Sequence, residues 1–474
     1  MKLLPQAGSN TFVSNSFFIF LIRFFPTLAN LFIVIFFSRL LDKDSYGLYQ
    51  HFWVQLYFIS ALACLGVQSL VVTYQPALIA RLVKSFSVRS FAGYGIWLLV
   101  LAAIFAILQT DDTSTIIAFA MLLAYSLSIV IESLLTAFRR FTFLAIINFI
   151  YTVVFLLLHW LLVEYHWSVI QMLGYILAIT VIKLAITSLS LNSALRNQEE
   201  YTGSYSLESI RRLWMHIGVY DVSQTLFRWI DKFVISFLFA KEIMAIYYNG
   251  SLEIPFLPIL LGAAGSAALM KLSTPESDAG QTADLMKRSG RLLSAIVFPI
   301  FFFFLVFRQE LFGVVLSGNY PSSIPIFAMA VLAMPLRAYS FTTVLQNRHR
   351  GDIMNIGAVG DMIIACALMY PLYQVLGLPG IALSFVISSY LQAVYYLWHS
   401  ARELDTNISA LLPLKNWIAK LILFSCAFIG FYYLVADSYS EEIVLALGCV
   451  LTGTAVCIAF FLELRTERKT HGAA

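Results

Sequence analysis

Residues 221–235 read DVSQTLFRWIDKFVI, so charged and polar side chains recur within a stretch that is otherwise apolar. In a helix, where successive residues are about 100° apart, these polar side chains share an arc of roughly 100°. They are Asp221, Gln224, Arg228, Asp231 and Lys232. A charge at the centre of a membrane helix costs about 2.5–3.5 kcal/mol on insertion scales. We therefore expect this face to meet a partner or a watery cavity instead of lipid.

The composition of the chain is that of a membrane protein. Of its 474 residues, 60% are hydrophobic and 12% are charged, whereas soluble domains carry about 25% charged residues. Apolar runs of about 20 residues recur along the whole chain, which indicates an all-α polytopic membrane protein. The five cysteines include no CxxC pair, and the seven histidines show no metal-binding spacing. No disulfide framework, metal site or other cofactor is predicted.

The apolar runs predict fourteen membrane-spanning helices. The first is too long for a signal peptide and no cleavage site follows it, so we expect it to be retained. With the N-terminus in the cytoplasm, the cytoplasmic segments hold 21 lysines and arginines and the outside segments hold four, which places both termini in the cytoplasm. The predicted spans are roughly 14–41, 47–75, 91–110, 115–137, 143–163, 168–192, 212–240, 244–270, 291–312, 323–345, 354–376, 378–400, 416–436 and 442–463.

An internal repeat organises these spans. LLDKDSYGLY (40–49) matches LFAKEIMAIY (238–247), and each copy lies just outside the first helix of a six-helix block. Because six is even, both blocks enter the membrane in the same direction and should be related by a pseudo-two-fold axis along the membrane normal, a transporter plan with the substrate site between the halves. The predicted domains are an N-lobe at 1–200, a C-lobe at 201–403 and two C-terminal helices with a tail at 404–474.

The first span carries a polar face of its own. Ser16, Arg23, Thr27 and Asn30 fall within an arc of about 60°. Shifted by the repeat offset, Arg23 corresponds to Asp221 and Asn30 to Arg228, so the two polar faces occupy matching places and predict one shared central cavity. Alternatively, each face packs against a neighbouring helix through local ion pairs, such as Arg228 with Asp231.

Several segments resemble one family of transporters. SRLLDKDSYGLY (38–49) resembles the R-L-L-x-x-x-x-Y-G-x-Y signature of polysaccharide and O-antigen flippases, which belong to the multidrug/oligosaccharidyl-lipid/polysaccharide exporter superfamily. RWIDKFVISFLFAKEIMAIYYNG (228–250) is similar to the family's second-half version, with Ala245 in place of the usual glycine. Segments 311–327 and 376–384 also resemble family segments. The thirteenth and fourteenth helices depart from the twelve-helix members and are similar to the extra pair of the bacterial lipid II flippases.

This resemblance implies a V-shaped alternating-access transporter of the bacterial inner membrane that is not an enzyme. Its substrate would be an undecaprenyl-diphosphate-linked oligosaccharide, an O-antigen or other surface polysaccharide unit, flipped from the cytoplasmic to the periplasmic leaflet. Arg23, Arg228 and Lys232 would bind the diphosphate and sugar head, in a cavity also lined by Asn30, Asp221 and Gln224. We expect a monomer among membrane lipids, with a polysaccharide polymerase or other assembly proteins as candidate partners and no nucleic acid.

Acidic residues inside the predicted spans are candidates for coupling transport to protons or sodium. They are Glu132, Asp231, Glu253 and Asp361. The alternatives are structural: Glu132 and Glu253 would hydrogen-bond to neighbouring helices, and Asp361 would pair with Arg337. Lys183 lies near the end of its helix, and we expect its side chain to extend toward the membrane surface.

Two other functions compete with the flippase. A cation-coupled drug or metabolite exporter of the same superfamily would favour a cavity of carboxylates and aromatic rings, whereas the two polar faces mix arginine and lysine with acids. A membrane glycosyltransferase or polymerase would need a large outside loop with catalytic groups, and every predicted outside loop is short. Asp42-Lys43-Asp44 matches the D-x-D of membrane glycosyltransferases, but the repeat copy reads Ala240-Lys241-Glu242.

Overall fold

The computed structural model describes residues 9–85, 88–109, 114–196, 198, 201, 206–252, 279–348 and 350–471. Side chains at 9–23 lie outside the description. The first ten helices are α1 (Ser9–Leu40), α2 (Lys43–Cys64), α3 (Val67–Thr73), α4 (Pro76–Ser85), α5 (Val88–Leu108), α6 (Thr115–Ala137), α7 (Phe141–Glu164), α8 (Val169–Arg196), α9 (Leu207–Leu238) and α10 (Lys241–Gly250). Then follow α12 (Ala279–Val306), α13 (Arg308–Val315), α14 (Ser323–Val331), the 3₁₀ helix η1 (Met334–Ala338), α15 (Thr343–Asn347), α16 (Gly351–Leu376), α17 (Leu378–Glu403), α18 (Ile408–Leu411), α19 (Leu414–Val435) and α20 (Glu441–His471).

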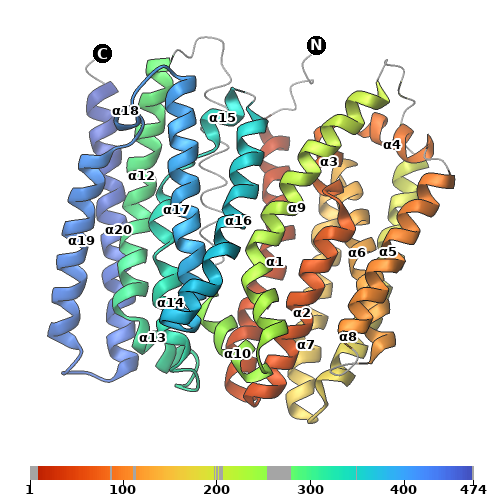
Figure 1. Ribbon diagram of the computed structural model, residues 1–474, viewed down its shortest axis with the longest axis horizontal. Coiled ribbons are helices and arrows are strands. Elements are labelled where there is room, and N and C mark those ends of the chain that lie inside the picture. Colours follow the sequence, from red (N-terminus) through yellow and green to blue (C-terminus); the bar gives the residue numbers. More distant parts are fainter. Residues whose placement is uncertain are drawn as a thin grey trace. The chain divides into compact units, whose positions relative to one another are not determined.

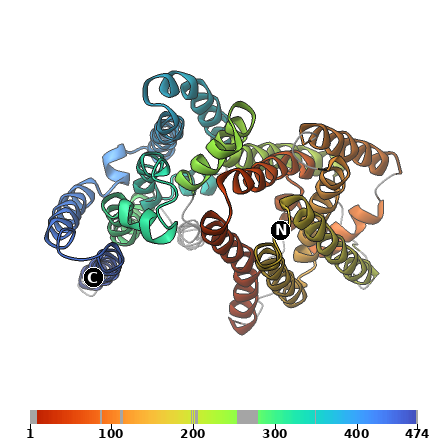
Figure 2. The ribbon, with the colours of Figure 1, turned by 90° about the horizontal axis from the view of Figure 1, so that it is seen from below.

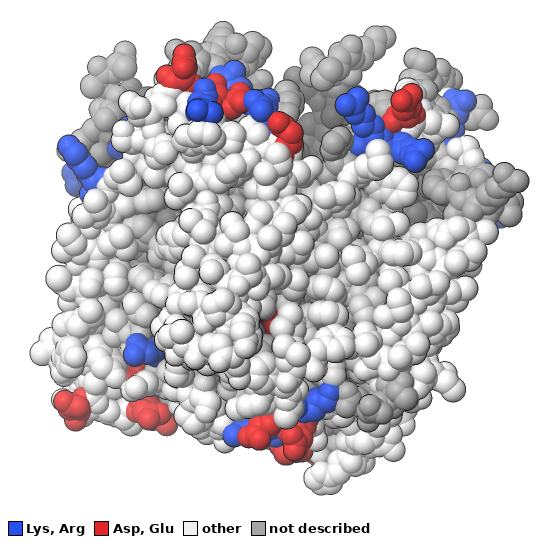
Figure 3. Space-filling view, in the orientation of Figure 1, with Lys and Arg blue, Asp and Glu red and all other residues white. Residues whose placement is uncertain are grey.

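The described helices confirm an all-α membrane fold. Eight of them are long and apolar enough to cross a membrane: α6, α7, α8, α12, α16, α17, α19 and α20. Shorter apolar helical stretches cover residues 24–40, 92–108 and 323–338. On the face drawn in Figure 3, Lys, Arg, Asp and Glu gather at the two ends of the helices, and the surface between the ends carries almost none. That uncharged belt is what a bilayer requires of the surface it covers.

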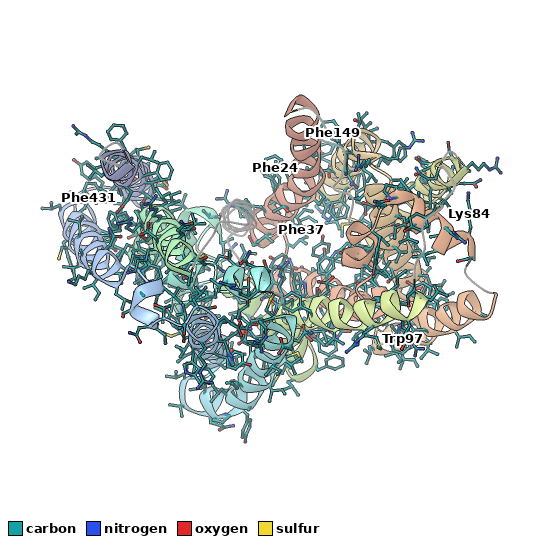
Figure 4. The ribbon with its side chains drawn as sticks, turned by 90° about the horizontal axis from the view of Figure 1, so that it is seen from above. Phe24, Phe37, Lys84, Trp97, Phe149 and Phe431 are labelled. Carbon is teal, nitrogen blue, oxygen red and sulfur yellow. The ribbon has the colours of Figure 1, made fainter. Side chains whose placement is uncertain are left out.

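The chain forms two compact units, residues 1–245 and 246–474. In the first unit, α6 packs on α8, α1 on α7 and α2 on α9, and both ribbon views place α2 and α9 side by side (Figures 1 and 2). Edge-to-face contact between Phe25 and Phe149, with ring centroids 5.0 Å apart, joins α1 to α7. Figure 4 labels Phe149 on α7.

The boundary between the units differs from the predicted lobe boundary at residue 200. α9 was expected to open the C-lobe, but its contacts with α2 and α3 place it in the first unit. The predicted lobes were defined by the internal repeat, whereas the two observed units are defined by packing contacts. The predicted organisation into two lobes and two C-terminal helices therefore stays a prediction.

The second predicted span, 47–75, is two helices instead of one. α2 stops before Leu65, and Leu65 and Gly66 both adopt the left-handed conformation, with φ of 49° and 67°. A Cβ at Gly66 would overlap the Cα of Gly218 on α9, so the break allows the two backbones to touch. Trp214 Nε1 of α9 donates to the carbonyl of Leu65 at 2.8 Å. Hydropathy does not register this break because the residues around it are apolar.

The ninth and tenth predicted spans also differ from the structure. α12 begins at Ala279 instead of 291, because its first turns are a charged helical extension with an Asp284–Arg288 ion pair at 2.9 Å. The tenth span, 323–345, is divided among α14, η1 and α15. Pro335 lies at the start of η1, where its missing N–H cannot extend the α-helix before it.

In the second unit the two C-terminal helices pack on α12 through a buried charge. Lys420 Nζ of α19 pairs with Glu463 of α20 at 2.9 Å. The same ammonium donates to the carbonyl of Arg291 at 2.7 Å and to Ser294 Oγ at 2.9 Å, both on α12. Asn416 Nδ2 adds a hydrogen bond to Glu463 at 2.8 Å. One lysine thus joins three helices, and its charge is neutralised where it is buried.

The hairpin of α16 and α17 gives a test of the packing. A Cβ at Gly380 would overlap the carbonyl group of Leu372, whereas a Cβ at Gly360 on the same hairpin meets nothing within 4 Å. Gly380→Ala should therefore destabilise the protein by about 1–3 kcal/mol through overpacking. Thermal unfolding of the purified protein in detergent measures this effect.

Gly360→Ala is the matched control, and its stability should be equal to or slightly above that of the wild type because alanine favours the helix. Equal unfolding temperatures for the two variants would contradict the close approach at Gly380.

Candidate functional site

The polar face of α9 contains two different environments. Asp231 and Lys232 are buried, each with 7% of its surface exposed, and their side chains form an ion pair at 3.2 Å. Arg228, one turn earlier, is exposed, and Asp221 and Gln224 are half-buried. Lys232 is therefore a partner of Asp231, and the pairing of Arg228 with Asp231 stays a prediction. The pair can remain in a low-dielectric environment because it is nearly neutral, whereas Arg228 keeps access to its surroundings.

The polar face of α1 is only partly described. Asn30 is exposed. The Arg23 side chain lies outside the described side chains, although its backbone belongs to α1. The expected convergence of Arg23 with Arg228 therefore stays a prediction.

Glu132 of α6 lies in an ion pair between three helices. Its carboxylate contacts Lys183 Nζ of α8 at 2.6 Å, and Asn148 Nδ2 of α7 donates to it at 3.3 Å. This arrangement is the structural alternative to ion coupling, in which Glu132 bonds to neighbouring helices. The expectation that Lys183 extends to the membrane surface is wrong: a carboxylate within reach attracts the ammonium inward, because the interaction of opposite charges is strong away from water.

Asp361 of α16 is the buried acid of the second unit, with 4% of its surface exposed. Ser388 of α17 interacts with its carboxylate, while Oδ1 has no hydrogen-bond partner among the described residues. The expected pairing with Arg337 is wrong: Arg337 is exposed on η1, and the described residues contain no ion pair between the two. Glu253, the remaining candidate for ion coupling, lies outside the described residues.

The two copies of the internal repeat touch each other within the first unit. Lys43 of α2 pairs with Glu242 of α10 at 3.4 Å. A Cβ at Gly47 would overlap the carbonyl oxygen of Lys241, so the starts of α2 and α10 are in backbone contact. In the sequence, the aligned pairs Lys43–Lys241 and Asp44–Glu242 were the signal that related these two segments.

A network of uncharged and basic groups lies beside this contact, and the sequence reasoning missed it. Gln55 of α2 donates to Ser236 Oγ of α9 at 3.0 Å and accepts from Gln109 Nε2 at 2.8 Å. His51 bonds to Gln55 through one ring nitrogen and to Lys241 Nζ through the other. These bonds fasten α2 to the junction of α9 and α10. Only the spacing of His51 and Gln55 by one helical turn was visible in the sequence.

Asp42 of the D-x-D segment has a structural role. Asp42 is the N-cap of α2, and its carboxylate accepts a hydrogen bond from the backbone N–H of Ser45 at 2.8 Å. This bond stabilises the ionised carboxylate and lowers the pKa of Asp42 below its ordinary value. Among the described residues, no group of three or more His, Cys, Asp and Glu side chains is arranged to hold a metal ion.

The site on α9 can hold a charged, hydrated group inside a membrane protein. Arg228 offers a planar fork of donors that stays ionised, and the half-buried Asp221 and Gln224 lie on the same face of the helix. The sequence correctly placed these groups on one helix, and the structure adds which of them are sealed and which are accessible.

Comparisons with known proteins identify the family. The family described as polysaccharide biosynthesis protein matches residues 36–325, more than half of the chain. A comparison with curated proteins finds no match.

Solved structures show the same fold. The lipid II flippase MurJ in an inward closed conformation superposes with a TM-score of 0.66 at 15% sequence identity, over 96% of this chain and 99% of that chain. An inward-facing multidrug-resistance MATE transporter of the MOP superfamily gives 0.52 at 16% identity, over 81% and 95%. A MATE structure in complex with MaL6 gives 0.53 at 16% identity, over 84% and 96%. The proteins compared are a flippase and multidrug transporters.

The predicted resemblance is thus confirmed by the family match and by the fold. The chain belongs to the polysaccharide biosynthesis protein family and has the fold of the flippases and transporters of the MOP superfamily.

Proposed function

We propose that the protein is a flippase that moves an undecaprenyl-diphosphate-linked oligosaccharide from the cytoplasmic to the periplasmic leaflet of a bacterial inner membrane. Both of its termini would face the cytoplasm, it would act as a monomer, and a polysaccharide polymerase would use its product. The family match and the flippase fold support this proposal. The observation that carries it is the exposed Arg228 on α9, a helix in which the neighbouring charges are sealed as a pair.

The chemistry of the substrate explains why such an arginine is useful. A lipid-linked oligosaccharide has a polar head that cannot cross hydrocarbon and a tail that need not leave it. A diphosphate diester carries about two negative charges, and Arg donates several hydrogen bonds to phosphate oxygens while remaining ionised. Outward movement of these negative charges across a membrane potential that is negative inside gains about 2.3 kcal/mol per charge per 100 mV. Such transport needs no ATP, and the sequence contains no Walker A motif.

A second candidate function is a cation-coupled exporter of the same superfamily. It is favoured by Asp361, whose buried Oδ1 has no hydrogen-bond partner among the described residues and could accept a proton or sodium ion. Glu132 and Asp231 support it less, because each is already paired with a lysine. Asp361→Asn separates the two functions: transport that no longer responds to an ion gradient favours the exporter, and unchanged glycan export favours the flippase without coupling at this site.

Removal of the cavity arginines tests the flippase directly. Arg23→Ala and Arg228→Ala should each lower the surface glycan about tenfold or more, because a charge-assisted hydrogen bond to the diphosphate is worth about 1.5–3 kcal/mol. The glycan is measured by immunoblot in a strain that lacks the native protein and expresses the variant at normal levels.

Arg212→Ala is the matched control, since Arg212 is exposed near the start of the same helix. This variant should keep the wild-type amount of glycan. Wild-type glycan in both Arg23→Ala and Arg228→Ala would refute the diphosphate-binding role.

The contact between the repeat copies allows a second test. We expect the starts of α2 and α10 to separate during alternating access, when the site opens to the outside. In a variant without the five native cysteines, Lys43→Cys together with Glu242→Cys should be joined by a short bismaleimide, and the joined protein should not export glycan. Each single-cysteine variant, treated identically, should remain active. Full export by the joined protein would show that this contact stays closed throughout transport.

A further inference from the structure

A continuous row of aromatic rings crosses the first unit. Tyr151 stacks on Phe155 at 5.8 Å between centroids, and Phe155 meets Trp53 edge to face at 6.0 Å. Trp53 continues to Tyr57 at 5.5 Å, and Tyr57 continues to Trp229 at 4.9 Å. These five rings come from α2, α7 and α9. With Tyr125 of α6, which lies 5.8 Å from Tyr57, they form the aromatic row.

Two rings of the row are buried and four are partly accessible. Trp53 and Phe155 are buried, whereas Tyr57, Tyr125, Tyr151 and Trp229 keep part of their surface accessible. For Tyr151 this accessible side is not the lipid side. The exposed large hydrophobic residues of α7 are Ile146, Phe149, Ile150, Val153, Leu157 and Trp160. At about 100° per residue, their face is roughly 150° from Tyr151. The accessible part of Tyr151 therefore faces away from the lipid side of α7.

A lysine paired with a carboxylate stands at each end of the row. At one end Lys183 Nζ lies 4.6 Å above the ring of Tyr151, and it is the partner of Glu132 at 2.6 Å. At the other end Lys232 Nζ lies 5.9 Å from the ring of Trp229, and it is the partner of Asp231 at 3.2 Å. Each end thus offers a donor and an acceptor together.

The row also contains a polar group that packing does not explain. Trp53 is 5% exposed, and its indole Nε1 has no hydrogen-bond partner among the described residues. A buried indole N–H normally finds a partner, because leaving it without one costs about 1–3 kcal/mol. A row that served only as apolar core would be better built from phenylalanine and leucine.

The chemistry of the row fits a sugar better than the other molecules that such a transporter meets. A pyranose presents C–H groups on its faces, which pack on aromatic rings, and hydroxyls on its edge, which bond to carboxylates and ammonium groups. An acyl chain has no use for the charged ends. A cationic drug would seek a carboxylate, but Glu132 and Asp231 are each neutralised by a lysine.

We propose that the aromatic row is a carbohydrate-binding wall that holds the sugar rings of the transported head group. This role rests on the proposed flippase function and adds the place of the sugars to it. Sugars stacked along the row would exchange hydroxyl hydrogen bonds with the partly accessible Lys183–Glu132 pair. Aromatic faces tolerate many sugars, so the wall would select for a saccharide without specifying one sequence.

Binding of two lipids by the full-length protein in nanodiscs tests this wall. The probes are undecaprenyl diphosphate and undecaprenyl diphosphate carrying one N-acetylhexosamine. The wild type should bind the sugar-bearing probe about 2- to 10-fold more tightly, the range expected of one aromatic contact. Tyr57→Ala and Trp229→Ala should remove this preference and leave the affinity for undecaprenyl diphosphate unchanged. Tyr57→Phe, which keeps the ring, should keep the preference.

The control is Trp160→Ala, which removes an exposed ring from the lipid side of α7 and should keep the preference. Equal affinity of the wild type for the two probes would overturn the wall while leaving the flippase intact. An equal loss of both affinities in Tyr57→Ala would show that the row is structural and would also overturn it. If the wild type binds neither probe, the proposed flippase function itself fails.

Discussion

The free energy of placing a charge in hydrocarbon constrains this structure more than any other interaction. Along the described helices, several charges are neutralised by a partner on the same or a neighbouring helix, and some of these pairs join helices. Lys420 joins three helices in the second unit, and Glu132 collects groups from two neighbours in the first. Among the described residues, such pairs include Glu132–Lys183, Asp231–Lys232 and Lys420–Glu463. The exposed arginine on α9 supports the proposal that a polar ligand binds there.

The internal repeat also constrains the packing. Its two copies approach each other, and the starts of α2 and α10 come into backbone contact at Gly47 and Lys241. Glycine at this point follows from that contact, since a side chain would separate the two copies. The hydrogen bonds of Gln55 hold the adjoining part of α2 to α9, so the contact and the polar face belong to one connected structure.

The fold could be predicted from the sequence because hydropathy, charge asymmetry and the repeat all depend on local composition. The polar face of α9 could be predicted equally well, because its five side chains lie on one helix. Lys183 was misplaced because its partner, Glu132, is on another helix and nothing in the spacing connects the two. The break at Leu65 escaped notice because its cause is the approach of Gly218 from α9. The aromatic row was invisible for the same reason: its rings come from four helices.

The account depends on water reaching the polar face of α9. In a variant that lacks the native cysteines, Arg228→Cys can be treated with a charged, water-soluble thiol reagent, beside Ile150→Cys on the lipid-facing side of α7. The account predicts rapid modification at position 228 and none at position 150, where only a lipid-soluble reagent should react. An unreactive cysteine at 228 would place this helix face in dry contact with protein or lipid and contradict the central claim.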